Sequence, residues 1–268
     1  MAPDLRWRAG NLLLAPHRLG FFLAMVVLIA SGAWWALVQL DRVSVSVALP
    51  YTFSPTLAHA AVMTYGFVPL FFTGFLFTAG PKWLGVEPLS TRILLAPALM
   101  QACGWLLWLA GIHLHLLSAL FGLALAWSGL TSMTWLYWRL IWRSRERDQL
   151  HARTIGAACL VGCISLAGLL ANLVVGETAV ALASVMTGLW GFVIAIVVTV
   201  AHRMIPFFTS NAMPFMSVLR PFWALGVMLG AAALESVAMW VEIDGPLQGP
   251  MAPVWMLARG ACELAAGS

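Results

Sequence analysis

Long apolar runs separated by short polar connections dominate the pattern of hydrophobic and polar positions along this chain. Seven of these runs reach the length of about twenty residues that an α-helix needs to cross the hydrocarbon core of a bilayer. Backbone groups in lipid must pair within their own segment, and no run alternates as barrel strands do, so each run predicts a transmembrane helix. The predicted spans are residues 18–40, 57–79, 92–112, 116–138, 153–175, 179–201 and 222–241.

Composition is consistent with this prediction over the whole chain. Hydrophobic residues make up 62% of the 268 positions and charged residues only 9%, which is too apolar for a soluble domain. We therefore expect one all-α integral membrane domain over residues 1–268, with the lipid bilayer as its main partner. The N-terminus has no short apolar run with a small-residue cleavage site, so we expect no cleaved signal peptide.

The basic residues indicate how the helices are oriented. All but two of the 14 Lys and Arg residues fall in the N-terminal segment and in alternate connections, and the two exceptions are Arg42 and Arg259. Under the positive-inside rule this asymmetry predicts a cytoplasmic N-terminus. Topology thereby explains the net charge of +4, and no pattern indicates a nucleic-acid partner.

Three connections and the C-terminal tail differ from simple turns. We expect residues 41–56 to lie on the membrane surface and residues 139–153 to form a charged extension of a helix. Residues 202–221 are aromatic and rich in proline, which predicts a loop packed against the bundle. Residues 251–266 are too short and too charged for an eighth span, so they predict an interfacial helix.

The second span carries the clearest chemical signals. His59 stands at its entrance, where an imidazole is costly in lipid without a ligand or a partner. At its exit Pro81 cannot continue a helix, and Lys82 and Trp83 suit the headgroup region. We therefore predict that this helix ends at the Gly-Pro step.

Histidines gather at both faces of the membrane once this topology is applied. The predicted outer face carries His59, His113 and His115. The inner face carries His17, His151 and His202. Imidazoles from different helices of a bundle can converge on a haem or a metal ion, so each face predicts one candidate site. The alternative is that they are solvated side chains at helix ends, and we favour that interpretation for His151 in its charged loop.

Other side chains leave two or more interpretations open. Glu235 lies about two turns inside the seventh span. It could be a proton carrier, a partner for an outer histidine, a metal ligand, or a neutral acid bonded between helices. Cys159 and Cys163 share a helix face and could supply soft metal ligands. They could equally be small residues that allow close packing, as we expect for Gly226-x-x-x-Gly230.

Three segments resemble one family of membrane proteins. Residues 73–85, Thr-Gly-Phe-Leu-Phe-Thr-Ala-Gly-Pro-Lys-Trp-Leu-Gly, are similar to the Ala-Gly-Phe-Leu-Leu-Thr-Ala-x-Pro-x-Trp-Thr-Gly signature of NnrS proteins. Residues 203–211 resemble that family's Arg-x-Ile-Pro-Phe-Phe-Thr segment, and residues 16–23 resemble its start, so the resemblance covers roughly residues 16–212. It implies a bacterial inner-membrane protein that binds haem, with copper as a further candidate, and that acts in nitric oxide metabolism or relief of its toxicity.

The chain also departs from the pattern of this family. Its second span keeps only the first histidine of the family's Trp-His-x-His-Glu sequence, because it reads Ala58-His59-Ala60-Ala61-Val62. Family members are typically longer, and their later histidine-bearing helices have no counterpart here. The resemblance therefore implies a short member that has lost the metal centre or completes it with a partner subunit.

Spacing and resemblance together predict specific cofactor ligands. We expect His59 to be an axial ligand of haem b near the outer face, with His113 or His115 opposite and Glu235 supplying an acid. An inner site would use His17, His202 and Arg203, the last of these meeting a propionate or a lipid phosphate.

The predicted function is haem binding in nitric oxide or respiratory metabolism, without turnover by the chain alone. The main alternative is a non-catalytic accessory subunit of a larger respiratory membrane complex. A transporter comes third, because apart from Pro69 and Pro97 the spans show little sign of the broken helices that transporters use.

Overall fold

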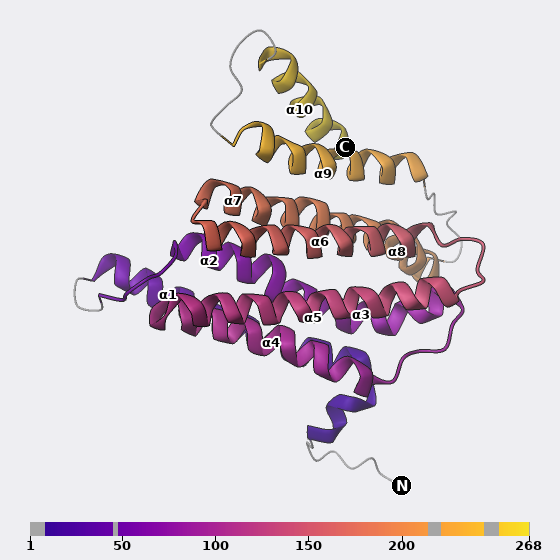
Figure 1. The fold of residues 1–268 in the computed structure, drawn as a ribbon. Coiled ribbons are helices and arrows are strands. Elements are labelled where there is room, and N and C mark those ends of the chain that lie inside the picture. The colour runs from indigo at the N-terminus through magenta and orange to yellow at the C-terminus, as the bar shows by residue number, and fades with distance from the viewer. Residues whose placement is uncertain (1–8, 45–47, 214–220, 244–251, 268) are drawn as a thin grey trace. The chain divides into compact units, whose positions relative to one another are not determined.

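The computed structural model describes residues 9–44, 48–213, 221–243 and 252–267, and all regular structure in these ranges is helical (Figure 1). The chain separates into two compact units, Met1–Arg147 and Asp148–Ser268, called here the N-terminal and C-terminal units. Seven helical runs in the described ranges are long and apolar enough to cross a membrane, which confirms the predicted all-α class and number of spans.

The spans lie where the apolar runs predicted them, and most are longer. They extend over Pro16–Val43, Pro55–Leu84, Thr91–Leu114, Leu116–Arg143, Leu150–Val175, Thr178–Ser210 and Phe222–Val241. Proline occupies the first turn of two of them, where its missing N–H costs no helical hydrogen bond. Because a helix rises about 1.5 Å per residue, the longer runs extend beyond the hydrocarbon core.

Two glycines bring α1 (Pro16–Val43) and α3 (Val68–Leu84) into backbone contact. A Cβ atom added at Gly20 would lie 2.5 Å from both the Cα and the N of Gly74, and 2.9 Å from the carbonyl oxygen of Leu70. Only a residue without a side chain fits this crossing. Both glycines belong to the segments that carry the family resemblance, 16–23 and 73–85.

The second span is one helical run with a wide turn inside it. α2 (Pro55–Val62) passes through a π-helical segment, η2 (Met63–Phe67), into α3. Pro69 follows directly, and since its nitrogen has no N–H to donate, a widened turn before it accommodates the ring.

The prediction that this helix stops at Pro81 is wrong. α3 continues through Pro81 to Leu84 and is capped by Gly85, whose φ of 60° lies in the left-handed region. The N–H groups of Gly85 and Val86 both donate to the Pro81 carbonyl oxygen. A proline in the last turn removes only one backbone donor, so the cap that follows it decides where the helix ends.

A tight hairpin of α4 (Thr91–Leu114) and α5 (Leu116–Arg143) completes the N-terminal unit. His115 alone connects the two helices. A Cβ at Gly104 would lie 2.6 Å from the backbone N of Ala126, and one at Gly122 would lie 2.6 Å from the backbone N of Trp108. The two backbones therefore touch along the hairpin.

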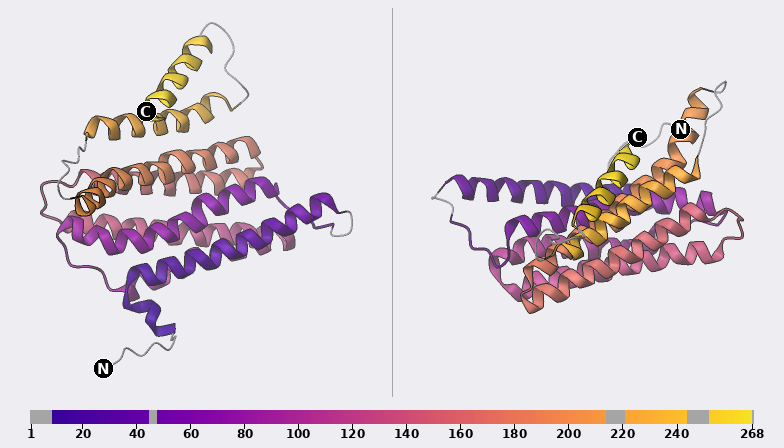
Figure 2. Two further views of the ribbon diagram at one scale, coloured as in Figure 1. Left: turned by 180° about the vertical axis from the view of Figure 1, so that it is seen from behind. Right: turned by 90° about the horizontal axis from the view of Figure 1, so that it is seen from above.

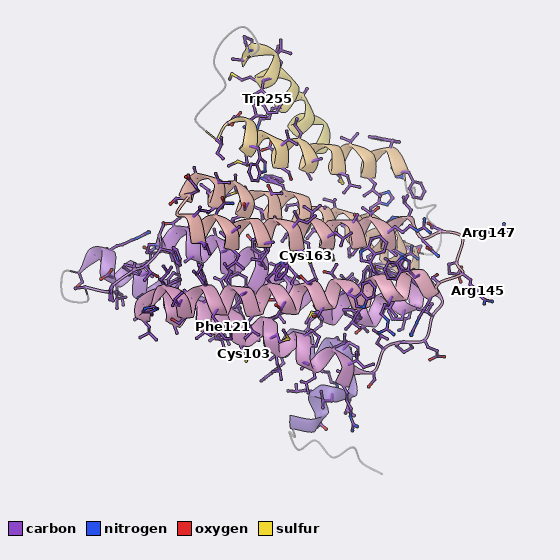
Figure 3. The ribbon with its side chains drawn as sticks, viewed as in Figure 1. Cys103, Phe121, Arg145, Arg147, Cys163 and Trp255 are labelled. Atoms are coloured by element: carbon purple, nitrogen blue, oxygen red, sulfur yellow. The ribbon has the colours of Figure 1, made fainter. Side chains whose placement is uncertain are left out.

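The predicted charged extension around residues 139–153 is partly helical. α5 reaches Arg143, and Ser144 then donates from Oγ to the Leu84 carbonyl oxygen at 2.6 Å. Arg145 and Arg147 project from the connection that follows (Figure 3).

In the C-terminal unit, α6 (Leu150–Val175) is followed by a second run with a wide turn, formed by α7 (Thr178–Thr187), the π-helical η3 (Gly188–Ile194) and α8 (Ala195–Ala212). The prediction that a packed loop begins at residue 202 is wrong. α8 continues through Pro206 to Ala212, and the Phe207 and Phe208 side chains are more than half exposed. Pro206 removes one backbone donor, which does not end the helix. Residues 214–220 of the predicted loop lie outside the described residues.

The last two helices are α9 (Phe222–Val241) and α10 (Ala252–Gly267). Figure 2 shows α10 folding back over α9. The helix predicted over residues 251–266 is confirmed as α10, and its interfacial position stays a prediction. The close packing expected at Gly226 and Gly230 is not observed, because no described atom lies within 4 Å of a Cβ built at either position.

Candidate functional site

His59 lies in the second turn of α2, against the Trp35 indole of α1. The two rings stack with their centroids 4.3 Å apart and an interplanar angle of 14°. The Nδ1 atom of His59 is buried, and none of the described atoms forms a hydrogen bond with it. Because buried ring nitrogens in proteins normally bond to protein, water or metal, this atom is a candidate ligand.

Contacts from α1 fix the surroundings of His59. The Arg42 guanidinium lies 5.1 Å from the centre of the Trp35 ring, within the range of a cation–π contact. One turn after His59, the Met63 sulfur accepts a hydrogen bond from Ser31 Oγ at 3.6 Å. The orientation of His59 therefore depends on the register of α1 against α2.

Both ring nitrogens of His113 are already in hydrogen bonds. Nε2 accepts from the Trp34 indole N–H at 2.7 Å, and Nδ1 lies 2.8 Å from the Pro50 carbonyl oxygen. A carbonyl oxygen can only accept, so Nδ1 carries the proton and the ring is neutral. For His113 to bind a metal through Nε2, the bond from Trp34 would have to break.

The connection before α2 is tied to the same end of the unit. Tyr51 donates from its hydroxyl to Asp41 Oδ2 at 2.8 Å, and its ring centre lies 5.1 Å from that of His113. Thr52 donates from both its backbone N and its Oγ1 to the Ile112 carbonyl oxygen, at 2.9 and 3.0 Å. Burial is the largest cause, and the hydrogen bond to Asp41 the next, of a pKa of Tyr51 that is raised to about 12.

We expect the Tyr51 phenol to ionise near its raised pKa of about 12, well above the value of about 10 for a free tyrosine. The folded protein then keeps a proton that the unfolded chain loses. The stability that this group contributes is complete below about pH 10 and is lost as the pH rises toward 12. Ultraviolet titration of phenolate, with Tyr51→Phe to identify the signal, measures the midpoint. Asp41→Asn should lower it, and an unchanged midpoint would contradict this assignment.

His115 caps the N-terminus of α5 and is exposed. Its Nδ1 accepts from the backbone N of Leu117 at 3.1 Å. Among the residues that the structure describes, no group of three or more His, Cys, Asp or Glu side chains could hold a metal ion. The structure thus does not gather His59, His113 and His115 into one metal centre.

The residues of the predicted inner site belong to different units. His17 lies at the start of α1 in the N-terminal unit, with Nδ1 3.5 Å from Thr78 Oγ1. His202 and Arg203 lie in α8 of the C-terminal unit.

His202 pairs with His151, which the sequence analysis assigned to a solvated loop. α6 begins at Leu150, so His151 lies in its first turn and is only 1% exposed. His151 Nε2 lies 3.0 Å from His202 Nδ1, and His202 Nε2 lies 3.1 Å from the Pro221 carbonyl oxygen. His202 Nε2 therefore carries a proton, which it donates to the Pro221 carbonyl oxygen. The early start of α6 was the signal that could have placed His151 inside.

The His151 and His202 rings meet edge to edge. Their centres are 5.3 Å apart, and this exceeds the distance between the bonded nitrogens by about two ring radii. The two nitrogens consequently lie almost on the line between the ring centres. This arrangement shares a proton, whereas two metal ligands would direct both lone pairs at a third atom.

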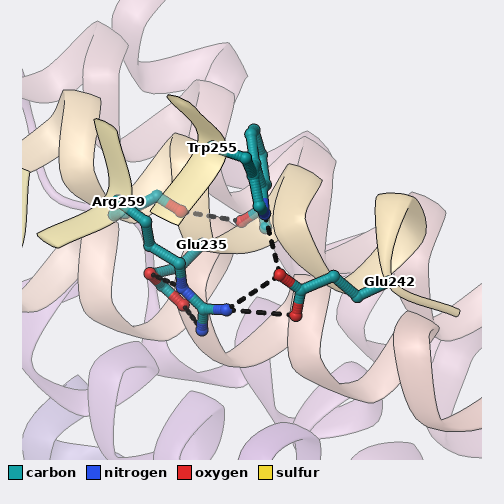
Figure 4. Close-up of polar contacts among 6 residues, drawn as sticks. Glu235, Glu242, Trp255 and Arg259 are labelled. Carbon is teal, nitrogen blue, oxygen red and sulfur yellow. Dashed lines mark hydrogen bonds and ion pairs between the residues drawn. The ribbon is translucent and has the colours of Figure 1, made fainter. Parts of the chain in front are cut away.

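Glu235 is paired with a cation from α10 (Figure 4). Arg259 donates from Nε and Nη2 to the two Glu235 oxygens at 2.8 and 2.7 Å, and from Nη1 to Glu242 Oε2 at 3.1 Å. Trp255 Nε1 donates to Glu242 Oε1 at 2.8 Å. The hydrogen bond to Glu235 is the main cause of a raised Arg259 pKa, so the guanidinium stays charged.

The structure describes three cysteines, Cys103, Cys159 and Cys163, and all of them are free thiols. Cys159 and Cys163 are buried on α6 without a disulfide, and Figure 3 shows Cys163 on that helix and Cys103 on α4. The Met133 sulfur accepts a hydrogen bond from Thr73 Oγ1 at 2.9 Å. Both interpretations of the cysteine pair, soft ligands or small packing residues, remain open.

Comparison with known proteins identifies the family. A family profile described as NnrS protein matches residues 11–267, which include helices of both units. No curated protein and no solved structure matches the chain. The match extends the resemblance seen over residues 16–212 in both directions, and it covers nearly the whole sequence. The chain therefore belongs to the NnrS family.

Proposed function

We propose that this protein binds haem b through His59 and acts in nitric oxide or respiratory metabolism in the bacterial inner membrane. Family membership and seven apolar helices support the physiological setting. The observation that carries the ligand assignment is the buried Nδ1 of His59, which forms no hydrogen bond with any described atom.

The residues around His59 would let its imidazole hold a haem iron. Trp35 stacks on one face of the imidazole and sets its plane. A neutral imidazole is an ordinary ligand for haem iron. Haem, when bound, would supply a redox-active iron that takes a small diatomic ligand. His59 would hold it through a ring nitrogen, while Trp35 keeps water from one side of the ring.

The opposite ligand in this proposal is His115 or His113. His115 is exposed, and its ring is tied only through Nδ1 to the α5 N-terminus. His113 would first have to exchange its bond from Trp34. Of the two, His115 would have to give up fewer hydrogen bonds to become a ligand.

Copper is the second candidate cofactor at the same place. Met63 follows His59 by one turn of α2, so the two side chains lie on one helix face. Imidazole and thioether are both suitable copper ligands. In the described structure the Met63 sulfur accepts a weak hydrogen bond from Ser31, which a metal would replace.

A second haem position in the C-terminal unit would use His202 and Arg203, and a part for His17 of the N-terminal unit stays a prediction from sequence. It has less support, because both nitrogens of His202 are engaged by His151 and Pro221. Arg203 would meet a propionate or a lipid phosphate with its guanidinium.

Removing the His59 imidazole tests the proposal. We expect His59→Ala to weaken haem binding by at least about tenfold, because metal sites lose this much even when an outer-shell partner is removed. Haem titration into the detergent-purified chain, followed in the Soret region, measures the affinity. Ser132→Ala on α5 is the control, since it changes an exposed side chain that bonds only to its own helix and has no cofactor role here. If His59→Ala bound haem with the same affinity as the parent protein, the proposal would be contradicted.

The accessory-subunit alternative is favoured by one observation on α9. In the described part of the chain no atom lies within 4 Å of a Cβ built at Gly226 or Gly230, and glycines at this spacing let a second helix approach closely in a membrane. Purification in mild detergent with native membranes distinguishes the two functions. A stoichiometric respiratory complex that dissociates in Gly226→Leu would favour the alternative, and a haem-loaded single chain would favour the first proposal.

A further inference from the structure

Three large polar side chains follow one face of α4 through the interior of the N-terminal unit. Gln101, Trp105 and Trp108 are spaced four and three residues apart, and each has a relative exposure of 0%. Their hydrogen-bonding groups are therefore out of reach of bulk water or lipid headgroups.

Trp105 fixes the orientation of the Gln101 amide. Its indole N–H donates to Gln101 Oε1 at 2.7 Å. Turning the amide over would place two donors against each other, so the oxygen must face Trp105. The Nε2 group then points away from Trp105, and its two N–H bonds can donate to other acceptors.

Two donors on this face have no partner among the described atoms. They are Nε2 of Gln101 and Nε1 of Trp108, and both are fully buried. The large majority of buried side-chain polar atoms in proteins are hydrogen-bonded to protein or to ordered water. Two such donors lie within two turns of one helix. We therefore expect a hydrogen-bond acceptor here that is not one of the side chains of this region.

We propose that internal water molecules occupy this face of α4 and accept hydrogen bonds from Gln101 Nε2 and Trp108 Nε1. Both groups are neutral donors, so the site suits an uncharged acceptor better than an anion. A buried water needs two to four polar partners, and the wide turn of η2 can supply a backbone carbonyl. This turn is adjacent, because the Trp105 ring lies 3.0 Å from a Cβ built at Gly66.

The position of this water has a consequence for the N-terminal unit. His59 precedes η2 on the same helical run and carries another buried nitrogen without a described partner. Water beside η2 would bring exchangeable protons into the bundle next to that run. The inference itself needs no haem and stands whether or not His59 binds one.

Indole N–H resonances of the full chain in detergent test the inference. In a sample labelled with ¹⁵N-tryptophan, Trp108→Phe and Trp105→Phe assign the two signals. We expect the Trp108 N–H to show a cross-peak at the water frequency that is several-fold stronger than that of Trp105, whose N–H is bonded to Gln101. Equal or absent cross-peaks would overturn the proposal.

A density map that resolves waters provides an independent measurement if either variant fails to fold. The expected result is a water-sized peak within hydrogen-bonding distance of Trp108 Nε1 or Gln101 Nε2. Empty density there, or density of a larger group or a partner chain, would overturn the proposal.

Discussion

Gly20→Ala should destabilise the N-terminal unit by about 3 kcal/mol, because overpacking typically costs about 1–3 kcal/mol and here every nearby atom is backbone. The new methyl group would lie 2.5 Å from the Gly74 Cα and N atoms and 2.9 Å from the Leu70 carbonyl oxygen. A flexible side chain could move aside, but these atoms belong to α3. The α1 and α3 helices would therefore have to separate along their crossing.

Gly32→Ala on the same helix is the matched control. No described atom lies within 4 Å of a Cβ at Gly32, so the added methyl group meets open space. Alanine also has the higher helix propensity, so stability should be unchanged or slightly improved. Unfolding in mixed micelles of increasing SDS content measures the free energy of unfolding of both variants. Equal stability of the two would mean that α1 and α3 do not cross at these glycines.

Arg259→Met should destabilise the α9–α10 pair by about 3 kcal/mol, the low end of the cost of breaking a buried ion pair. Glu235 is only 6% exposed and would lose its bidentate partner. We use the low end of this cost because the Arg259 side chain is 31% exposed and therefore partly solvated.

Two further variants isolate this effect. Arg259→Met combined with Glu235→Gln should recover most of the loss, because no unpaired buried charge remains. Arg153→Met is the control in the same unit, since Arg153 is exposed and bonds to Gln149, the residue just before its own helix. Limited proteolysis between α9 and α10 and SDS unfolding report the change. If the single and double variants were equally unstable, the ion pair would not be what holds α10.

The helices could be predicted from sequence because lipid imposes a simple rule. A run of about twenty apolar residues must satisfy its backbone internally, so its length and composition determine a span. The ends of the helices were harder to predict. Pro81 lacks a donor but does not set the end of α3, which Gly85 does, and Pro206 likewise lies inside α8.

The contacts between helices could not be read from spacing. The Gly226-x-x-x-Gly230 spacing predicted close packing, yet the described backbone contacts lie at isolated glycines such as Gly20 and Gly74. Nothing local distinguishes a glycine that meets another helix from one that faces open space. That difference depends on how α1 and α3 cross.

The candidate site was predictable only in part for the same reason. A mid-span Glu235 predicted a partner, but its partner Arg259 lies 24 positions later on α10. His151 was placed in a loop because the start of α6 was set three residues too late, and its bond to His202 depends on tertiary packing. His59 could be singled out from sequence as an unusual imidazole, while its stacking on Trp35 required the register of α1.

The visible absorption spectrum of the detergent-purified chain, with a reduced pyridine haemochrome assay and metal analysis, tests the central claim most directly. Haem binding through His59 predicts a b-type haem close to one per folded chain, with a Soret band that His59→Ala removes or shifts. A protein that is folded by circular dichroism but colourless and free of metal, including after haem is offered, would contradict the claim.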